Sequence, residues 1–383
     1  MKQYLLTILA ATLAITGCAK FNASAPDDES DQLINFQAAT FLNATKADPD
    51  LDGHQKMPVS KFKVTALYTG DKGWAEINLK EAVRYMYDVV VTKSVSESVE
   101  SWIPSADYYW PKTGKLSFIG YSSTNLGLST MIDEEHRNQF FQIKNFEVKD
   151  DSDDLLVSDI TTDKTGANAK DKQHVAAGVP MLFHHVLSKI NFNAKLKPNV
   201  STDNIKHYAF IKSMSIKQIY TKGNFVFDAS EKTVLNGVWT TTGDAVDQNE
   251  LYTNSTALQK VGDKYNAAEN DLSTTEATSL LSDENGMLVL PQKLTDSAVV
   301  ELSYVIYFCN DRGTILDIYE GDNETFSLNT FKVSGTTTPL DEWEQNKVYN
   351  YTVIVDPNSP DKITFDPAVV PWVDPEVVLE EEI

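Results

Sequence analysis

Short stretches in which apolar and polar residues alternate make up much of the chain. In residues 61–69, apolar side chains occupy the even positions, while lysines and threonines take most of the odd ones. Residues 182–196, 299–308 and 349–355 show similar patterns and are rich in β-branched and aromatic residues. A period of two is typical of half-buried strands, and clusters of Gly, Asn, Asp, Ser and Thr separate these stretches. The pattern predicts an all-β fold of antiparallel sandwich type with little helix.

The strand-like stretches fall into two groups, which predict two tandem β-sandwich domains. Residues 162–174 are polar, contain almost no apolar residue and separate the two groups. We therefore expect an N-terminal sandwich over 33–172 and a C-terminal sandwich over 173–383. The chain length of 383 residues is consistent with two domains.

The first residues have the pattern of an export signal. An apolar run from Leu5 to Ile15 follows Lys2 and is too short to span a bilayer as a helix. It ends in Ile15-Thr16-Gly17-Cys18, the pattern of a bacterial lipobox, in which the thiol receives lipid and the chain is cut before it. The sequence predicts a lipoprotein signal peptide over 1–17, lipid (palmitate included) at Cys18 and an acidic tether over 18–32. An ordinary cleavable signal with an incidental cysteine is the alternative.

Charge and cysteine content narrow the function further. The net charge of −22 would repel a phosphate backbone, so the composition argues against nucleic-acid binding. The chain has two cysteines, and if Cys18 carries lipid, Cys309 has no partner left for an intramolecular disulfide. We expect Cys309 to be a small buried apolar residue within a strand.

Catalytic and metal-binding motifs are weak in this sequence. We find no nucleophile elbow, no H-E-x-x-H and no phosphate-binding glycine loop, so no catalytic residue, resident metal or cofactor is predicted and the chain is expected not to be an enzyme. The acidic clusters Asp133–Glu135 and Asp150–Asp154 are expected to be solvated turns rather than a carboxylate pair for glycoside hydrolysis.

Two other groups of polar residues suggest metal ligands only superficially. Asp48, Asp50 and Asp52 precede Gly53 as in a calcium loop, but Val59 stands where the bidentate glutamate belongs, which favours a solvated loop and leaves calcium open. His184 and His185 are adjacent on a predicted strand, so their side chains should point to opposite faces and cannot share a metal ion. We expect one of them to be buried with a hydrogen-bond partner and the other to be exposed.

An aromatic segment offers a second type of function. Trp102, Tyr109 and Trp110 lie close together in the sequence, and exposed aromatic rings of this kind can stack on a sugar. The alternative is packing in the core or at the sandwich edge. A surface lipoprotein that binds glycans is therefore the second hypothesis for this chain.

The order of several segments resembles the fimbrillin (Mfa-like) family. After the lipobox come "FKVTALYTGDKGWAEI" and "YYWPKTGKLSFIGYSS", followed by F-x-H-x-L-S-K at 183–189 and L-P-Q at 290–292. Members of this family are pilins and accessory lipoproteins of type V pili. The resemblance implies two transthyretin-like, Greek-key sandwiches, an outer-membrane lipid anchor at the cell surface, and association with other pilus subunits in adhesive fimbriae. A host receptor or glycan as adhesion ligand would be a further partner.

The resemblance also implies assembly by strand exchange, in which a protease removes the first strand and a strand of the next subunit replaces it. The stretch 33–41 is the expected leaving strand, and 373–383 is the candidate donor. Relatives are often cut after an arginine, but no arginine lies between Cys18 and Arg84. Lys46 and Lys56 are the candidate processing sites instead. If neither is cut, the subunit would stay lipid-bound as an anchor or terminal accessory subunit.

Overall fold

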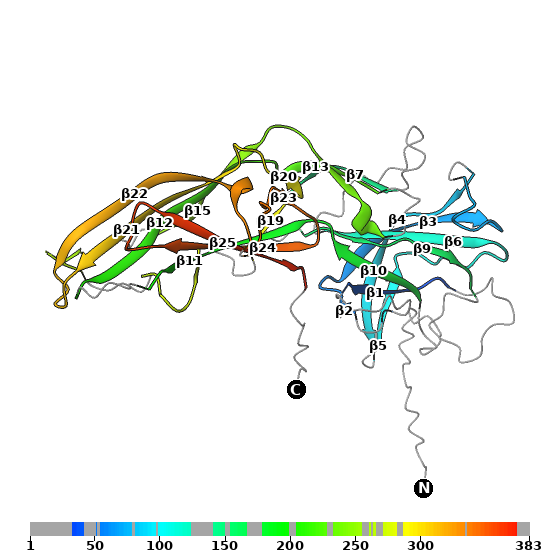
Figure 1. Cartoon of the computed structure of the whole chain (residues 1–383). Coiled ribbons are helices and arrows are strands. Elements are labelled where there is room, and N and C mark those ends of the chain that lie inside the picture. Colours follow the sequence, from blue (N-terminus) through cyan, green and yellow to red (C-terminus); the bar gives the residue numbers. More distant parts are fainter. Residues whose placement is uncertain are drawn as a thin grey trace, which may run out of the picture.

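The computed structural model consists of β-sheets (Figure 1) and describes residues 33–41, 51, 54–78, 81–96, 99–123, 141–149, 154–166, 178–198, 204–227, 233–254, 260–261, 263–265, 271–281, 286–333 and 335–373. Helix in these ranges is limited to two short 3-10 turns, η2 (Val234–Asn236) and η3 (Leu328–Thr330). Neither turn is long or apolar enough to cross a bilayer. The prediction of an all-β fold is confirmed.

A nine-stranded sheet forms the N-terminal part of the molecule and closes on itself. Its strands follow the order β10-β8-β6-β3-β4-β5-β1-β2, and β9 pairs with β6. The sheet is closed by a further pairing of β1 with β10. The closed sheet encloses a core rich in aromatic rings, among them Phe36, Phe62 and Phe118. The strands are β1 (Phe36–Thr40), β2 (Gln55–Lys56), β3 (Lys61–Gly70), β4 (Val83–Ser96), β5 (Val99–Pro104), β6 (Lys115–Ser122), β8 (Leu156–Ser158), β9 (Thr161–Lys164) and β10 (Val179–His185).

The position of β10 differs from the sequence-based division of the chain. The boundary at 172/173 placed this strand at the start of the second sandwich, but its hydrogen bonds run to β1 and β8 of the first sheet. The chain enters the second set of sheets only at β11 (Ser188–Leu196). Val186 and Leu187 separate the two strands, and both side chains are fully buried. The crossing therefore lies in a buried apolar step and not in the polar stretch 162–174.

Two further sheets pack face to face in the C-terminal part, which lies at the left of Figure 1. One has the order β18-β11-β24-β25, with β19 also on β11, and the other has the order β15-β12-β21-β22. Alternate residues of β11, β12, β21 and β24 share one hydrophobic core. The strands are β12 (Lys206–Ile219), β15 (Val246–Thr253), β18 (Thr278–Ser279), β19 (Met287–Val289), β21 (Val299–Cys309), β22 (Ile315–Ser327), β24 (Lys347–Val355) and β25 (Ile363–Pro371).

A three-stranded sheet connects the two parts of the molecule. Its strand β7 (Phe141–Glu147), from the N-terminal half of the sequence, pairs with β13 (Lys222–Phe227), which pairs with β14 (Val238–Thr241). A hydrophobic cluster beneath it contains residues from β6, β7 and β13 as well as Val186 and Leu187. Two small pairs complete the sheets: β16 (Lys260–Val261) with β17 (Lys264–Tyr265), and β20 (Gln292–Lys293) with β23 (Glu342–Trp343). The two parts thus share packed residues and backbone pairing.

Two of the described strand pairs run in a direction that differs from the prediction. Most described pairs are antiparallel as predicted, but β1 runs parallel to β10 and β11 runs parallel to β24.

Cys309 is buried and free, as expected, in a cluster with Phe210, Tyr265 and Tyr307. Burial, and secondarily the Asp271 carboxylate, raises the pKa of the Cys309 thiol, which disfavours the reactive thiolate.

Truncation of Phe225 should test the packing of the connecting sheet. Phe225 is fully buried on β13, and its ring lies 5.3 Å from that of Trp239. We expect Phe225→Ala to lower the free energy of unfolding by about 3–5 kcal/mol because a cavity replaces the ring. Urea denaturation measures this, with the exposed neighbour Val238→Thr as a control that should change it by no more than about 0.5 kcal/mol. A Phe225→Ala protein as stable as the control would contradict the described packing.

Candidate functional site

The first described strand, β1, is held by neighbours on both edges. It pairs in parallel with β10 from Phe36/Val179 to Thr40/Phe183, and it contacts β2 and β5 in the antiparallel sense. Beyond the strand itself, the Ile34 amide donates to the Tyr108 carbonyl at 2.7 Å. The Phe41 amide donates to the Phe183 carbonyl at 2.8 Å. The segment 33–41 is therefore an integral strand of the closed sheet.

Apolar side chains of β1 and its flank fill the core of this sheet. Ile34 and Phe36 are each only 1% exposed. The Phe36 ring meets those of Phe62 and Phe118 edge-on, at 5.9 and 5.6 Å between centroids. Burial of each such side chain contributes roughly 1.5–3 kcal/mol. Without β1, the sheet would have an apolar trough and an open backbone edge along β10.

A glycine at the entrance to β10 lets the two strands approach. The Val179 amide donates to the Asn35 carbonyl at 2.7 Å. A Cβ atom on Gly178 would lie 2.1 Å from that same carbonyl oxygen, far inside van der Waals contact. Any larger residue at position 178 would therefore push β1 away from β10.

At the other end of β10, two histidines are each paired with an aspartate. His184 Nε2 lies 3.0 Å from Asp159 Oδ2, and His185 Nδ1 lies 2.8 Å from Asp154 Oδ2. Both histidines are buried, at 2% and 3% exposure. The prediction of opposite faces for the two side chains is compatible with their separate aspartates, but the prediction that one is exposed is wrong. Asp154, expected in a solvated turn, instead serves as the partner of His185.

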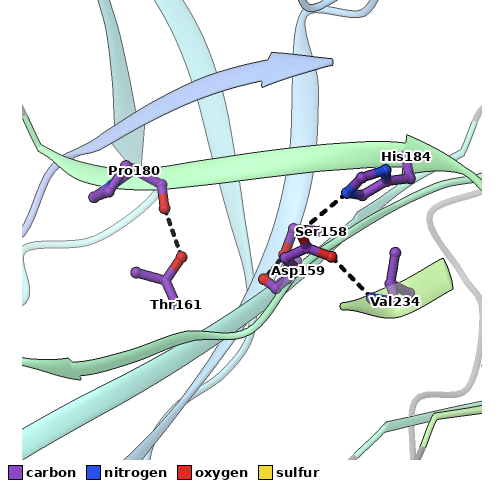
Figure 2. Close-up of polar contacts among 7 residues, drawn as sticks. Ser158, Asp159, Thr161, Pro180, His184 and Val234 are labelled. Atoms are coloured by element: carbon purple, nitrogen blue, oxygen red, sulfur yellow. Dashed lines mark hydrogen bonds and ion pairs between the residues drawn. The ribbon is translucent and has the colours of Figure 1, made fainter. Parts of the chain in front are cut away.

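Asp159 joins three segments through its two carboxylate oxygens (Figure 2). Its Oδ2 contacts His184 on β10, and its Oδ1 accepts the Val234 amide of η2 at 2.8 Å. Close by, the Thr161 hydroxyl donates to the Pro180 carbonyl at 2.6 Å. Asp159 thus ties β10, of the first sheet, to a turn that packs against the connecting sheet. Sequence reasoning missed Asp159, because a single aspartate after a short strand has no distinctive pattern.

The two histidines also contact the two ends of the folded chain. The Phe41 ring, at the end of the β1 segment, stacks on His184 with 4.8 Å between centroids. The Trp372 ring, directly after β25, stacks on His185 at 4.0 Å and nearly parallel. Lys189 Nζ lies 4.3 Å from the centroid of the Trp372 ring, in a cation–π arrangement. The segment 33–41 and the residue that precedes 373–383 thus meet adjacent residues of β10.

The candidate residues of the glycan hypothesis are placed mainly in the core. Trp102 is 1% and Trp110 is 5% exposed, and both belong to the core of the closed sheet. Tyr109 is 46% exposed and stands alone among the three. The buried positions of the two tryptophans match the core-packing alternative and leave no three-ring platform.

The processing and metal candidates are only partly placed. Lys56 is an exposed residue of β2 and pairs with Ala39 of β1. Several other candidates lie outside the described residues: Cys18, Lys46, Asp48, Asp50, Asp52, Asp133–Glu135, Asp150–Asp153 and 374–383. Within the described ranges, no group of three or more His, Cys, Asp or Glu side chains is arranged to hold a metal ion.

The comparison with known families identifies the chain. The model of the fimbrillin-like family matches residues 56–372, which is most of the sequence. The chain belongs to the fimbrillin-like family. Among curated protein sequences, no relative matches it.

Solved structures agree with this assignment at the level of the fold. A fimbrial protein from Bacteroides vulgatus is 18% identical, with a TM-score of 0.60, and the match covers 89% of this chain and 100% of that one. The tip fimbrial protein Mfa3 from Porphyromonas gingivalis, truncated at its C-terminus, is 10% identical over 89% of this chain and 98% of that one. Its TM-score of 0.37 is too low to carry an argument, so the shared fold rests on the first structure.

Substitution of Asp159 should test the connection between β10 and η2. Asp159→Ala leaves the His184 ring nitrogen and the Val234 amide without their acceptor, and each buried group left unpaired costs roughly 1–3 kcal/mol. Asp159→Asn keeps an oxygen for one of them and should lose less stability. Denaturant unfolding of the two variants provides the measurement. Equal stability of Asp159→Ala and the parent chain would show that the aspartate does not stabilise the connection between β10 and η2.

Proposed function

We propose that this fimbrillin-like protein is a lipid-anchored, non-enzymatic pilus subunit at the outer membrane, and that it assembles by exchange of β1. The observation that carries the proposal is the position of β1, a short strand near the N-terminus that closes a sheet and fills its core. Family membership supports the role of pilus subunit at the cell surface. The exchange step and the anchor are the parts that need experiments.

Departure of β1 would create a strong site for another strand. The edge of β10 over residues 179–183 would lose its partner, and the space of Ile34 and Phe36 would open. Each buried backbone group left unpaired costs roughly 1–3 kcal/mol, so insertion of an extended segment would be favoured along the whole edge. Contacts made head to tail in this way do not close on themselves and therefore produce a filament.

The proposed donor is the C-terminal segment 373–383. It contains Val377, Val378, Leu379 and Ile383, which can fill apolar positions of a groove, and four glutamates that keep the segment soluble before use. It follows Trp372, whose ring stacks on His185 beside the end of β10. The donor of one subunit thus starts from a fixed point, as assembly of identical subunits requires.

Of the two candidate processing sites, Lys46 is favoured over Lys56. Lys56 takes part in backbone pairing between β2 and β1, so a protease would have to open that pairing first. A cut after Lys46 would separate the lipid and β1 from the body while leaving β2 in the folded chain. Without any cut, the protein would remain at the membrane as an anchor or terminal subunit.

Removal of β1 tests the exchange. We expect that cutting the purified chain after Lys46 and releasing the N-terminal fragment produces a ladder of oligomers that resists mild SDS, because each open groove takes up a neighbour's segment. Gly178→Ala in the same cut chain should reduce the ladder, since the incoming strand meets the same methyl group as β1 would. A trimmed protein that stays monomeric at high concentration would exclude the stalk role and favour the anchor role.

The anchor is tested separately at the mature N-terminus. Mass spectrometry of the protein from intact cells should find an acylated Cys18 at the start of the unprocessed form. The Cys18→Ser protein should lack the acyl chains and should leave the membrane fraction, because the acyl chains are what would hold the protein at the membrane. Retention of the Cys18→Ser protein in the membrane fraction would contradict lipid anchoring through this residue.

A further inference from the structure

A hollow of about 800 Å³ lies where the connecting sheet meets the small β20–β23 pair. Residues 237–241 of β14 and the turn before it form one wall, and residues 291–293 and 342–347 form the other. Its volume falls within the usual range of roughly 300–1,000 Å³ for sites that bind small molecules. Neither the closed sheet nor the exchange of β1 requires an open space here, although Phe41 reaches its rim.

Gln345 lines this hollow, and its amide oxygen is buried without a hydrogen-bond donor among the described residues. Gln345 Nε2 donates to the Leu235 carbonyl at 2.6 Å and to the Gly237 carbonyl at 3.1 Å, which fixes the side chain between the two walls. Its Oε1 is buried and has no hydrogen-bond partner among the described residues. Since buried acceptors are nearly always satisfied, this oxygen suits a hydroxyl or N–H group of a bound molecule.

The charged side chains around the hollow balance one another. The lining includes two lysines, Lys293 and Lys347, and two glutamates, Glu342 and Glu344, so its formal charges sum to zero. None of the four forms an ion pair within the described part of the chain, so their polar atoms are available to a ligand. An anion or a cation would gain little from such a lining, whereas a neutral molecule with many hydroxyl groups can both donate to the glutamates and accept from the lysines.

An aromatic ring completes the wall formed by β14. Trp239 is half-buried, and its Nε1–H donates to the Val186 carbonyl at 2.6 Å. Phe146 and Phe225 pack against it at 5.8 and 5.3 Å between centroids. The indole is therefore fixed in place while part of it lines the hollow. A rigid aromatic surface beside amide and carboxylate groups is suited to the mixed apolar and hydroxyl faces of a sugar ring.

We propose that this hollow is a binding site for a neutral saccharide. Trp239 would pack against the sugar ring, Gln345 Oε1 would accept from a hydroxyl, and Glu342 and Glu344 would accept from further hydroxyls at the rim. The site is distinct from the segment that contains Trp102 and Trp110, whose rings are in the core. It also does not depend on strand exchange, because the hollow is present while β1 is in place.

A glycan array that carries neutral and sialylated oligosaccharides, probed with the purified full chain, tests the proposal. We expect saturable binding of at least one neutral saccharide, which isothermal titration then quantifies. Thr240→Trp, which adds a ring at an exposed lining position of β14, should weaken this binding about tenfold or more. Thr364→Trp, at an exposed position of β25 outside the lining, is the matched control and should leave the affinity unchanged.

The same measurements can overturn the proposal. Absence of binding to every neutral saccharide, binding of sialylated ones alone, or a Thr240→Trp protein that binds as tightly as the Thr364→Trp control would each exclude it. Gln345→Leu gives a second readout, since loss of the amide should weaken binding of the same saccharide. If Gln345→Leu does not fold, the comparison of Thr240→Trp with Thr364→Trp alone tests the proposal. These binding results do not depend on whether β1 is exchanged between subunits.

Discussion

The parallel pairing of β1 with β10 is the interaction on which the N-terminal part of this protein depends. It closes a nine-stranded sheet on itself, and it brings Ile34 and Phe36 into the core. The contact is also local: one short strand supplies it, and that strand enters the fold near the N-terminus. An element that is necessary for closure and is supplied by one short strand is well suited to replacement by an equivalent strand from another chain.

The histidine pair extends this dependence to the rest of the molecule. His184 contacts Phe41 at the end of the β1 segment, and His185 contacts Trp372 after β25. Asp159 connects the first of them to η2, which packs with the connecting sheet. The two histidines therefore contact residues near the first and the last described strands, β1 and β25.

The alternating pattern of the sequence was sufficient to predict the fold class, because a period of two follows directly from strand geometry. It did not place the crossing between the two parts. The buried positions of β10 are mainly odd-numbered and those of β11 are even-numbered, so the buried face changes at Val186 and Leu187. A pattern of apolar residues does not reveal which sheet each face belongs to. The pairings of β7 with β13 and of Asp159 with His184 were missed for the same reason, since both join residues far apart in the sequence.

A reversible covalent lock between β1 and β10 is the most direct test of the central claim. Ala39 and Leu182 are register partners on these strands, so Ala39→Cys with Leu182→Cys should form a disulfide that holds β1 in place. After cleavage of the chain following Lys46, the oxidised protein should remain monomeric, and reduction of the disulfide should allow it to form oligomers. Oligomers that form to the same extent with the lock closed would show that assembly does not require β1 to leave.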